Sequence, residues 1–346
     1  MDRKRLIITS AVVVVLVVLI ILQAHAYRKF DWGAFGEEIA QVNWWIILAA
    51  AGLVHIADGL RAVRWAIFLR PSRRINPVKL LAAQYIGFAG LALLGRPGEF
   101  IRPYIVAKRA RLSFASQVAV WTVERLFDSS SVAVILACDL LFAESLRTFP
   151  QYDAIRAGGL LLILLVALGA VLAFVVWKYG REIATRLEAG HHPSHVRHRI
   201  AFRIRSFGEG LHTIHDVSSF LAVTTVSLVI WALVAAAYWL VLHAYKDPEL
   251  TTLSMPHAVL LMSGSVAGGV LQLPVIGGGS QLATINLLLY LFNVNPNEPE
   301  LATSCGILLW LVTFISVAPL GLALARREHV SLRAITKESV HEEEEL

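Results

Sequence analysis

The sequence predicts an all-α polytopic membrane protein, on three observations. Of the 346 residues, 57% are hydrophobic and only 16% are charged, whereas soluble domains carry about 25% charged residues. Apolar runs of bilayer-spanning length recur along the whole chain. Lys and Arg gather in alternate loops, as they do on the cytoplasmic side of membrane proteins. We therefore expect about six full spans and two re-entrant helical hairpins.

Six apolar segments are long enough to cross a bilayer, which takes about 20 residues: residues 6–22, 44–69, 118–143, 158–177, 220–243 and 302–325. The first follows Arg3-Lys4-Arg5 and precedes Ala24-His25-Ala26, an arrangement that resembles a secretory signal with its cleavage site. Its 17 apolar residues exceed the usual signal core of about 7–15 residues. We therefore expect a retained first span, with cleavage as the alternative.

Two further apolar segments are interrupted by Gly and Pro. Residues 78–107 are broken at 95–98, and residues 258–292 are broken at 273–280. Each segment is too long for one span and has the length of two half-helices. Irregular backbone at membrane depth is tolerated only where it is buried in protein or lines a cavity. Each segment therefore predicts a re-entrant hairpin.

The distribution of basic residues favours this topology. With a cytoplasmic N-terminus and two hairpins that return to the side they entered, 21 of the 31 Lys and Arg residues are cytoplasmic and 5 are outside. The other 5 lie within the spans or at their edges. A first interrupted segment that crossed once would place Lys108, Arg109 and Arg111 outside, against the positive-inside rule. We therefore expect both termini in the cytoplasm.

The predicted elements follow the same order in both halves of the chain: span, span, hairpin, span. In residues 1–150 the hairpin 78–107 enters from the cytoplasm, and in residues 151–327 the hairpin 258–292 enters from outside. This is an inverted-topology repeat, a transporter architecture in which paired interrupted segments indicate the binding site.

Two regions lie outside the predicted bundle, a cytoplasmic linker at residues 178–218 and an acidic cytoplasmic tail at residues 328–346. The linker holds several histidines beside arginines, which favours a basic membrane-facing loop over a metal site. We predict no metal or other cofactor and no nucleic-acid partner. The chain has no Walker A, zincin, hydrolase or dinucleotide motif, so we expect no enzyme activity.

The most informative residues are Arg96, Glu99 and Arg102, at the break of the first hairpin. A charge near the bilayer centre costs about 2.5–3.5 kcal/mol, so such residues indicate a functional site. Their spacing on a helix puts all of them on one broad face. Two arginines against one glutamate leave a positive excess, and guanidinium groups and helix N-termini both bind phosphate. We predict a headgroup phosphate site here, with a salt-bridge staple without ligand as the alternative.

The span at 118–143 carries a second charged group, Glu124, Arg125 and Asp128. The two carboxylates stand four residues apart and therefore share a helix face. They either neutralise the hairpin arginines, which we favour, or titrate as a proton-coupling site. Arg125 either contacts the phosphate or holds the carboxylates.

The span at 44–69 carries a third polar group, His55, Asp58, Arg61 and Arg64. Steps of three residues drift by about 60° around a helix, so the four are not one tight site. We expect Asp58 and Arg61 to pair and face a cavity, in a charge-balancing or proton-coupling role. Arg64 is expected to snorkel to the interface.

The tip of the second hairpin is polar but uncharged. Its glycines permit close backbone approach, and its side chains offer a hydroxyl and an amide. The tip forms either a neutral ligand wall or gate, or simply a tight helix contact. The residues assigned to it are Pro274, Gly277, Gly278, Gly279, Ser280 and Gln281.

Residues 95–104 (GRPGEFIRPY), then Ser113, then residues 124–128 (ERLFD) resemble the transmembrane region of the lysylphosphatidylglycerol synthase/flippase family. Residues 61–65 (RAVRW) also fit. The resemblance covers nearly the whole chain and implies lipid translocation between leaflets of the inner (plasma) membrane. We expect no synthase activity, because we expect this chain to lack the soluble synthase domain of the multidomain members. Where the family often has a second Pro and a Glu at the second hairpin, this chain has Ile276 and Ala283.

We therefore expect a flippase that moves a phosphate-bearing lipid, either a phospholipid or a polyprenyl-phosphate-linked lipid. The arginines of the first hairpin would hold the headgroup, and a lipid-modifying enzyme is a possible partner. The alternative is a non-transporting lipid-binding scaffold, or a subunit of an envelope lipid-synthesis complex. A third class, an intramembrane transferase, would need a nucleophile or metal site that the sequence does not present.

Overall fold

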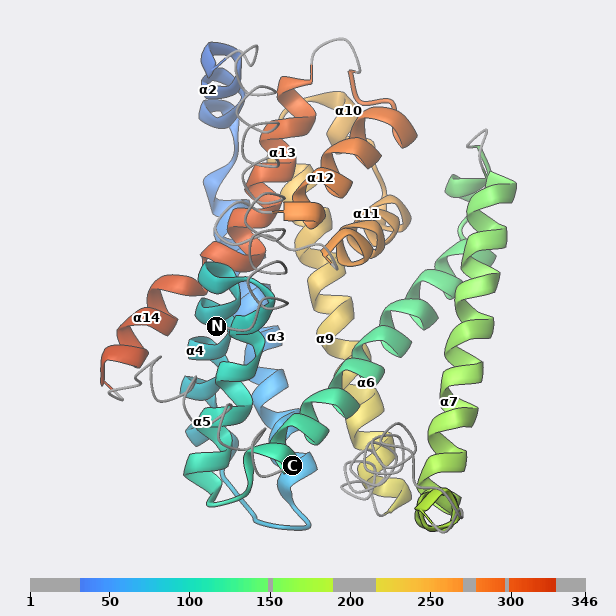
Figure 1. Ribbon diagram of the computed structural model, residues 1–346. Coiled ribbons are helices and arrows are strands. Elements are labelled where there is room, and N and C mark those ends of the chain that lie inside the picture. The colour runs from blue at the N-terminus through green and yellow to red at the C-terminus, as the bar shows by residue number, and fades with distance from the viewer. Residues whose placement is uncertain (1–31, 149–151, 189–215, 270–277, 296–298, 328–346) are drawn as a thin grey trace, which may run out of the picture.

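The computed structural model describes residues 32–148, 152–188, 216–269, 278–295 and 299–327 (Figure 1). Every regular element in these ranges is a helix, which confirms the all-α prediction. The predicted first span, residues 6–22, lies outside the described residues, as do the acidic tail and most of the predicted linker.

Four stretches of the described residues are long and apolar enough to cross a membrane. They are α3 (Trp44–Leu69), the part Tyr152–Gly169 of α7 (Tyr152–Glu188), α9 (Val217–Ala244) and the stretch Glu300–Arg327. Each matches a predicted span. The remaining predicted span, 118–143, lies within α6 (Phe114–Phe142), which has 29 residues but carries four charged ones. The chain is therefore a multi-pass membrane protein, and the total of about six spans stays a prediction.

Short polar caps start the long helices. The side-chain oxygen of Asn43 accepts from Trp45 N ahead of α3, and Ser113 accepts from Ser116 N ahead of α6. Each cap satisfies a backbone N–H group that has no partner within the helix. Short helices lie next to the long ones along the chain: α2 (Trp32–Gln41) precedes α3, the 3-10 turn Glu144–Thr148 follows α6, and α10 (Pro248–Thr251) follows α9.

The first interrupted segment forms two half-helices, as predicted. It consists of α4 (Pro77–Leu94), the 3-10 helix η1 (Arg96–Phe100) and α5 (Ile101–Ala110). Gly95 connects α4 to η1 with φ of 69°, a conformation that favours glycine. Gly98 packs on the backbone of Gly90 so closely that no Cβ would fit. The segment therefore folds back on itself, while its re-entrant course through a membrane stays a prediction.

The second interrupted segment also places two helices side by side. α11 (Met255–Gly268) packs along α12 (Gly278–Asn286), which continues as the π-helical turn Leu287–Leu291. A Cβ on Gly268 would lie 2.6 Å from the Cβ of Ala283, so these helices approach as closely as glycine allows. The break between them, with Pro274 and Gly277, lies outside the described residues.

α3 and α9 pack along each other and form the centre of the bundle (Figure 1). α4 lies against α3 on one side, and α11 lies against α9 on the other. The last span consists of α13 (Glu300–Trp310), the π-helical turn Leu311–Ile315 and α14 (Ala318–Arg327), and its α14 packs on α4. This packing encloses the polar side of α3 between α4, α5, α6 and α9.

Candidate functional site

Arg64 of α3 is at the centre of a buried ion network. Its side chain is 0% exposed, and its Nη1 donates to Asp128 Oδ1 at 2.7 Å and to Ser227 Oγ at 2.8 Å. Its Nη2 donates to Glu124 Oε1 at 2.5 Å. The expectation that Arg64 snorkels to the interface was wrong. Glu124 and Asp128, one turn apart on α6, offer two oxygens to one guanidinium fork, which compensates for its burial.

Arg102 joins the first hairpin to the same network. Its Nη2 donates to Glu124 Oε2, and its Nη1 donates to Gln84 Oε1 of α4 at 2.6 Å. The guanidinium carbon lies 4.3 Å from the centroid of the Trp65 ring, which is within cation–π range. Gly87 of α4 faces Arg102 and leaves room for it, because a Cβ there would lie 2.6 Å from the Arg102 Cβ. Glu124 therefore holds α3, α5 and α6 together through two arginines.

Arg125 is the member of the network that reaches the surface. Its side chain is 38% exposed, whereas those of Arg64 and Arg102 are 0% and 7% exposed. Its Nη2 lies 3.0 Å from Asp128 Oδ2 and 3.8 Å from Glu124 Oε2. Trp121 precedes it by one helical turn and packs on the exposed Phe100 of η1, with ring centroids 5.3 Å apart and ring planes tilted by 46°. Arg125 therefore emerges on the side of α6 that η1 flanks.

Asp58 and Arg61 form a second buried pair on α3. Arg61 Nη1 donates to Asp58 Oδ1 at 2.9 Å. The guanidinium carbon of Arg61 lies 5.8 Å from the centroid of the Trp231 ring, and Trp231 Nε1 donates to Asp128 Oδ1 at 3.0 Å. The other carboxylate oxygen, Asp58 Oδ2, is buried without a hydrogen-bond partner among the described residues. Trp231 therefore connects this pair to the network around Arg64.

The charges of these groups nearly cancel. Four arginines, Arg61, Arg64, Arg102 and Arg125, meet the carboxylates of Asp58, Glu124 and Asp128. Glu99 is half-buried on η1 and close enough to Arg125 to interact with its charge. With Glu99 included, four cations face four anions among these residues. Arg96, which gave the first hairpin its positive excess, is not in this count, because its side chain lies outside what the structure describes.

The predicted site residues do not all come together. Arg102, Glu124, Arg125 and Asp128 form one network, with Asp58 and Arg61 beside it. Arg96 begins η1, but its side chain lies outside what the structure describes.

The second hairpin contributes to a separate, uncharged cluster. Tyr238 of α9 donates to Ser265 Oγ at 2.9 Å, and Ser265 donates to the backbone oxygen of Ser280 at 3.3 Å. Ser280 and Gln281 are buried at the start of α12. Along α9, Tyr238 stands seven residues from Trp231, which is a rise of about 10 Å. The two clusters therefore occupy different levels of the bundle.

Several residues complete the network without a predicted site role: Arg64, which was assigned to the interface, and Gln84, Ser227 and Trp231, which were not singled out. The spacing of three between Arg61 and Arg64 was a usable signal, because it places two charges one helical turn apart within an apolar span. The neutral residues carried no signal, since a single Gln, Ser or Trp in a span is common. Among the described residues, no group of three or more His, Cys, Asp and Glu is placed to hold a metal ion.

A comparison with protein families gives one extensive match. The family model described as the lysylphosphatidylglycerol synthase TM region matches residues 6–336. No curated protein and no solved structure matches the chain. The matched range includes both interrupted segments and every residue of the ion network.

Proposed function

This chain belongs to the lysylphosphatidylglycerol synthase transmembrane-region family, and we propose that it is a flippase for a phosphate-bearing lipid. The substrate is a phospholipid or a polyprenyl-phosphate-linked lipid of the inner membrane. In the proposed orientation both termini face the cytoplasm, the chain acts without enzyme activity or cofactor, and a lipid-modifying enzyme supplies or receives the lipid. The observation that carries the proposal is the buried network with its one accessible arginine, Arg125.

Arg125 can exchange partners without leaving a buried carboxylate unpaired. When it turns to a phosphate, Asp128 keeps its bonds from Arg64 and Trp231. Glu124 keeps its bonds from Arg64 and Arg102. Removing one partner from a buried ion pair normally costs about 3–5 kcal/mol. This arrangement lowers that cost, because each carboxylate keeps an arginine and only Asp128 Oδ2 loses its close contact with Arg125. A guanidinium fork also matches two phosphate oxygens.

The packing of the two halves supports an alternating transport cycle. The second span of each half, α3 and α9, pack on each other. Each interrupted segment packs on the second span of its own half and on the last span of the other half: α4 contacts α3 and α14, and α11 contacts α9 and α6. This correspondence is what an inverted repeat would produce, and such repeats transport by moving one half against the other.

The test is leaflet exchange in liposomes that contain the purified chain. Labelled phosphatidylglycerol and a labelled polyprenyl phosphate are followed with a quencher that cannot cross the membrane. We expect exchange with the wild type and its loss with Arg125→Ala. Arg147→Ala removes an exposed arginine of the 3-10 turn at Glu144–Thr148 and serves as the matched control, which should exchange like the wild type.

One observation favours the alternative of a non-transporting lipid-binding scaffold. Arg64 and Arg102 are already satisfied by carboxylates and Gln84, as a purely structural staple requires. A scaffold binds lipid but leaves labelled lipid in its leaflet. Equal exchange in wild-type and protein-free liposomes, with the chain folded and inserted, would therefore favour this alternative over the flippase.

A further inference from the structure

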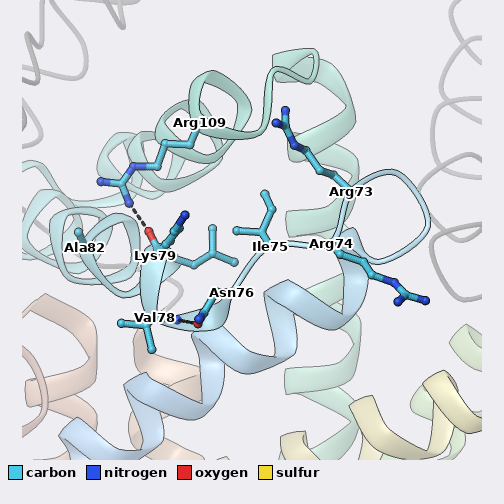
Figure 2. Close-up of a pocket in the computed structure, with 9 residues that line it drawn as sticks. Arg73, Arg74, Ile75, Asn76, Val78, Lys79, Ala82 and Arg109 are labelled. Atoms are coloured by element: carbon cyan, nitrogen blue, oxygen red, sulfur yellow. Dashed lines mark hydrogen bonds between the residues drawn. The ribbon is translucent and has the colours of Figure 1, made fainter.

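A second basic site lies apart from the ion network, where the α3–α4 loop meets the C-terminal end of α5. A hollow of about 570 Å³ opens there, and its basic lining residues are Arg73, Arg74, Lys79 and Arg109 (Figure 2). We call it the basic pocket. In Figure 2, Arg109 and Arg73 stand on either side, with Ile75 and Lys79 between them, whereas Arg74 points outward.

The two segments that form the basic pocket are strongly and uniformly basic. Residues 69–84 and 103–116 together hold seven Lys and Arg and no Asp or Glu. They are distant in the sequence, and the fold brings them together through α4 and α5. Grouped cations of one sign produce a positive potential that attracts an anion and orients its approach. The pocket therefore favours a negatively charged ligand.

Backbone contacts fix the shape of the basic pocket. Arg73 Nη1 donates to the backbone oxygen of Ala110 at 2.7 Å, which ties the loop to the end of α5. Arg109 Nη1 donates to the backbone oxygen of Lys79, which ties α5 to the start of α4. The Lys79 and Arg74 side chains are exposed and take part in neither of these two hydrogen bonds. The pocket is therefore built by two arginines, presents Lys79 to a ligand and carries the further charge of Arg74 at its rim.

The N-terminal end of α4 adds positive charge to the basic pocket. The Asn76 side chain caps this 18-residue helix by accepting from Val78 N at 3.0 Å, and Pro77 occupies its first turn. A helix N-terminus carries a partial positive charge of about half a unit. Asn76, Val78 and Lys79 all line the basic pocket, so this charge adds to that of the side chains. The Val78 and Lys79 N–H groups both bond to Asn76, so this end of α4 acts on an anion through its partial charge and not through free N–H groups.

The apolar lining favours a lipid over a free anion. Val78 is 69% exposed beside the cations, and Ile75 lies between them. An exposed apolar side chain in a basic pocket suits a ligand with a charged head and an apolar body. The positive-inside distribution puts this loop at the cytoplasmic boundary of the membrane, where anionic headgroups lie.

We propose that the basic pocket binds the phosphate headgroup of an anionic lipid from the cytoplasmic leaflet. Lys79 stands five residues before Gln84 on α4, and Arg109 stands seven residues after Arg102 on α5. These separations correspond to rises of about 7 and 10 Å toward the ion network. A headgroup in the pocket is therefore one to two helical turns from the proposed transport site. The binding is independent of the proposed flippase function, whereas the role as a stage before transport rests on it.

The test is binding of a soluble short-chain phosphatidylglycerol to the full chain in detergent, measured by calorimetry. The variant is Arg74→Glu/Lys79→Glu, which reverses two exposed charges. Each basic residue near an anionic surface contributes enough that losing two should weaken binding at least about tenfold. The matched control, Arg147→Glu/Lys246→Glu, makes the same charge change at exposed positions outside the pocket and should change binding less than about twofold.

Three outcomes would overturn the proposal: unchanged binding in the pocket variant, an equal loss in the control, or equally effective competition by inorganic phosphate. The last would make the pocket a simple anion site. Short-chain phosphatidylcholine, with no net charge, should bind more weakly than phosphatidylglycerol. Arg125→Ala should keep pocket binding while losing leaflet exchange, so failure of the flippase function and failure of this pocket give different results.

Discussion

Glu124 is the carboxylate that two buried arginines share, and its replacement by Gln should destabilise the protein strongly. The side chain is 1% exposed and accepts from Arg64 and Arg102. Gln keeps the shape but removes the charge, which leaves Arg102 without a carboxylate partner and Arg64 with Asp128 alone. Breaking a buried ion pair by removing one partner costs about 3–5 kcal/mol. For a chain of this size, with an unfolding entropy of about 0.7 kcal/mol/K, that corresponds to a melting temperature lower by about 4–7 °C.

The measurement is thermal unfolding of the purified chain in detergent, followed by loss of the monodisperse peak in size-exclusion chromatography. Glu144→Gln changes an exposed glutamate and should melt within about 2 °C of the wild type. The double variant Arg102→Gln/Glu124→Gln removes both members of one pair and should recover part of the loss. If Glu124→Gln and the wild type have the same melting temperature, the charge balance deduced for the network is wrong.

Four further substitutions test separate features of the structure. Gly98→Ala should prevent correct packing of the first hairpin and greatly reduce the folded yield, because its Cβ would meet the Gly90 backbone. Gly59→Ala, at a helical position with open space around it, should raise the melting temperature slightly. Arg125→Lys keeps the charge but not the planar fork, so we expect an exchange rate between those of the wild type and Arg125→Ala. Tyr238→Phe removes one buried hydrogen bond to Ser265 and should cost about 1 kcal/mol of stability, seen as a lower melting temperature, without changing exchange.

The break in the first hairpin could be predicted from sequence because it depends on local chemistry. Gly95 adopts a positive φ, and Gly98 contacts backbone, and both requirements favour glycine whatever surrounds them. The spacing of Glu124 and Asp128 likewise placed both carboxylates on one face, because helix periodicity fixes it. Patterns of this kind need no knowledge of the neighbouring elements.

The partners of Arg64 could not be predicted, because they come from other helices. Its place near the end of an apolar span suggested an interfacial position, since a long side chain can reach water there. The structure instead provides Glu124, Asp128 and Ser227, at least 60 residues away in the sequence. Burial of an arginine depends on whether such acceptors are present. That is decided by the packing of α3 against α6 and α9, which no local pattern records.

The need of buried arginines for acceptors on other helices also limits how the first hairpin can move. Arg102 is bonded to Glu124 of α6 and to Gln84 within the hairpin, so moving the hairpin away from α6 separates a buried ion pair. Such a separation is costly at membrane depth unless another anion takes the place of the carboxylate. A lipid phosphate is an anion that the membrane itself supplies. Motion of the hairpin should therefore be rare in the absence of substrate and frequent in its presence. The ion network would then hold the empty protein in one conformation and respond to the ligand, which makes the structural role of these arginines compatible with the proposed transport role.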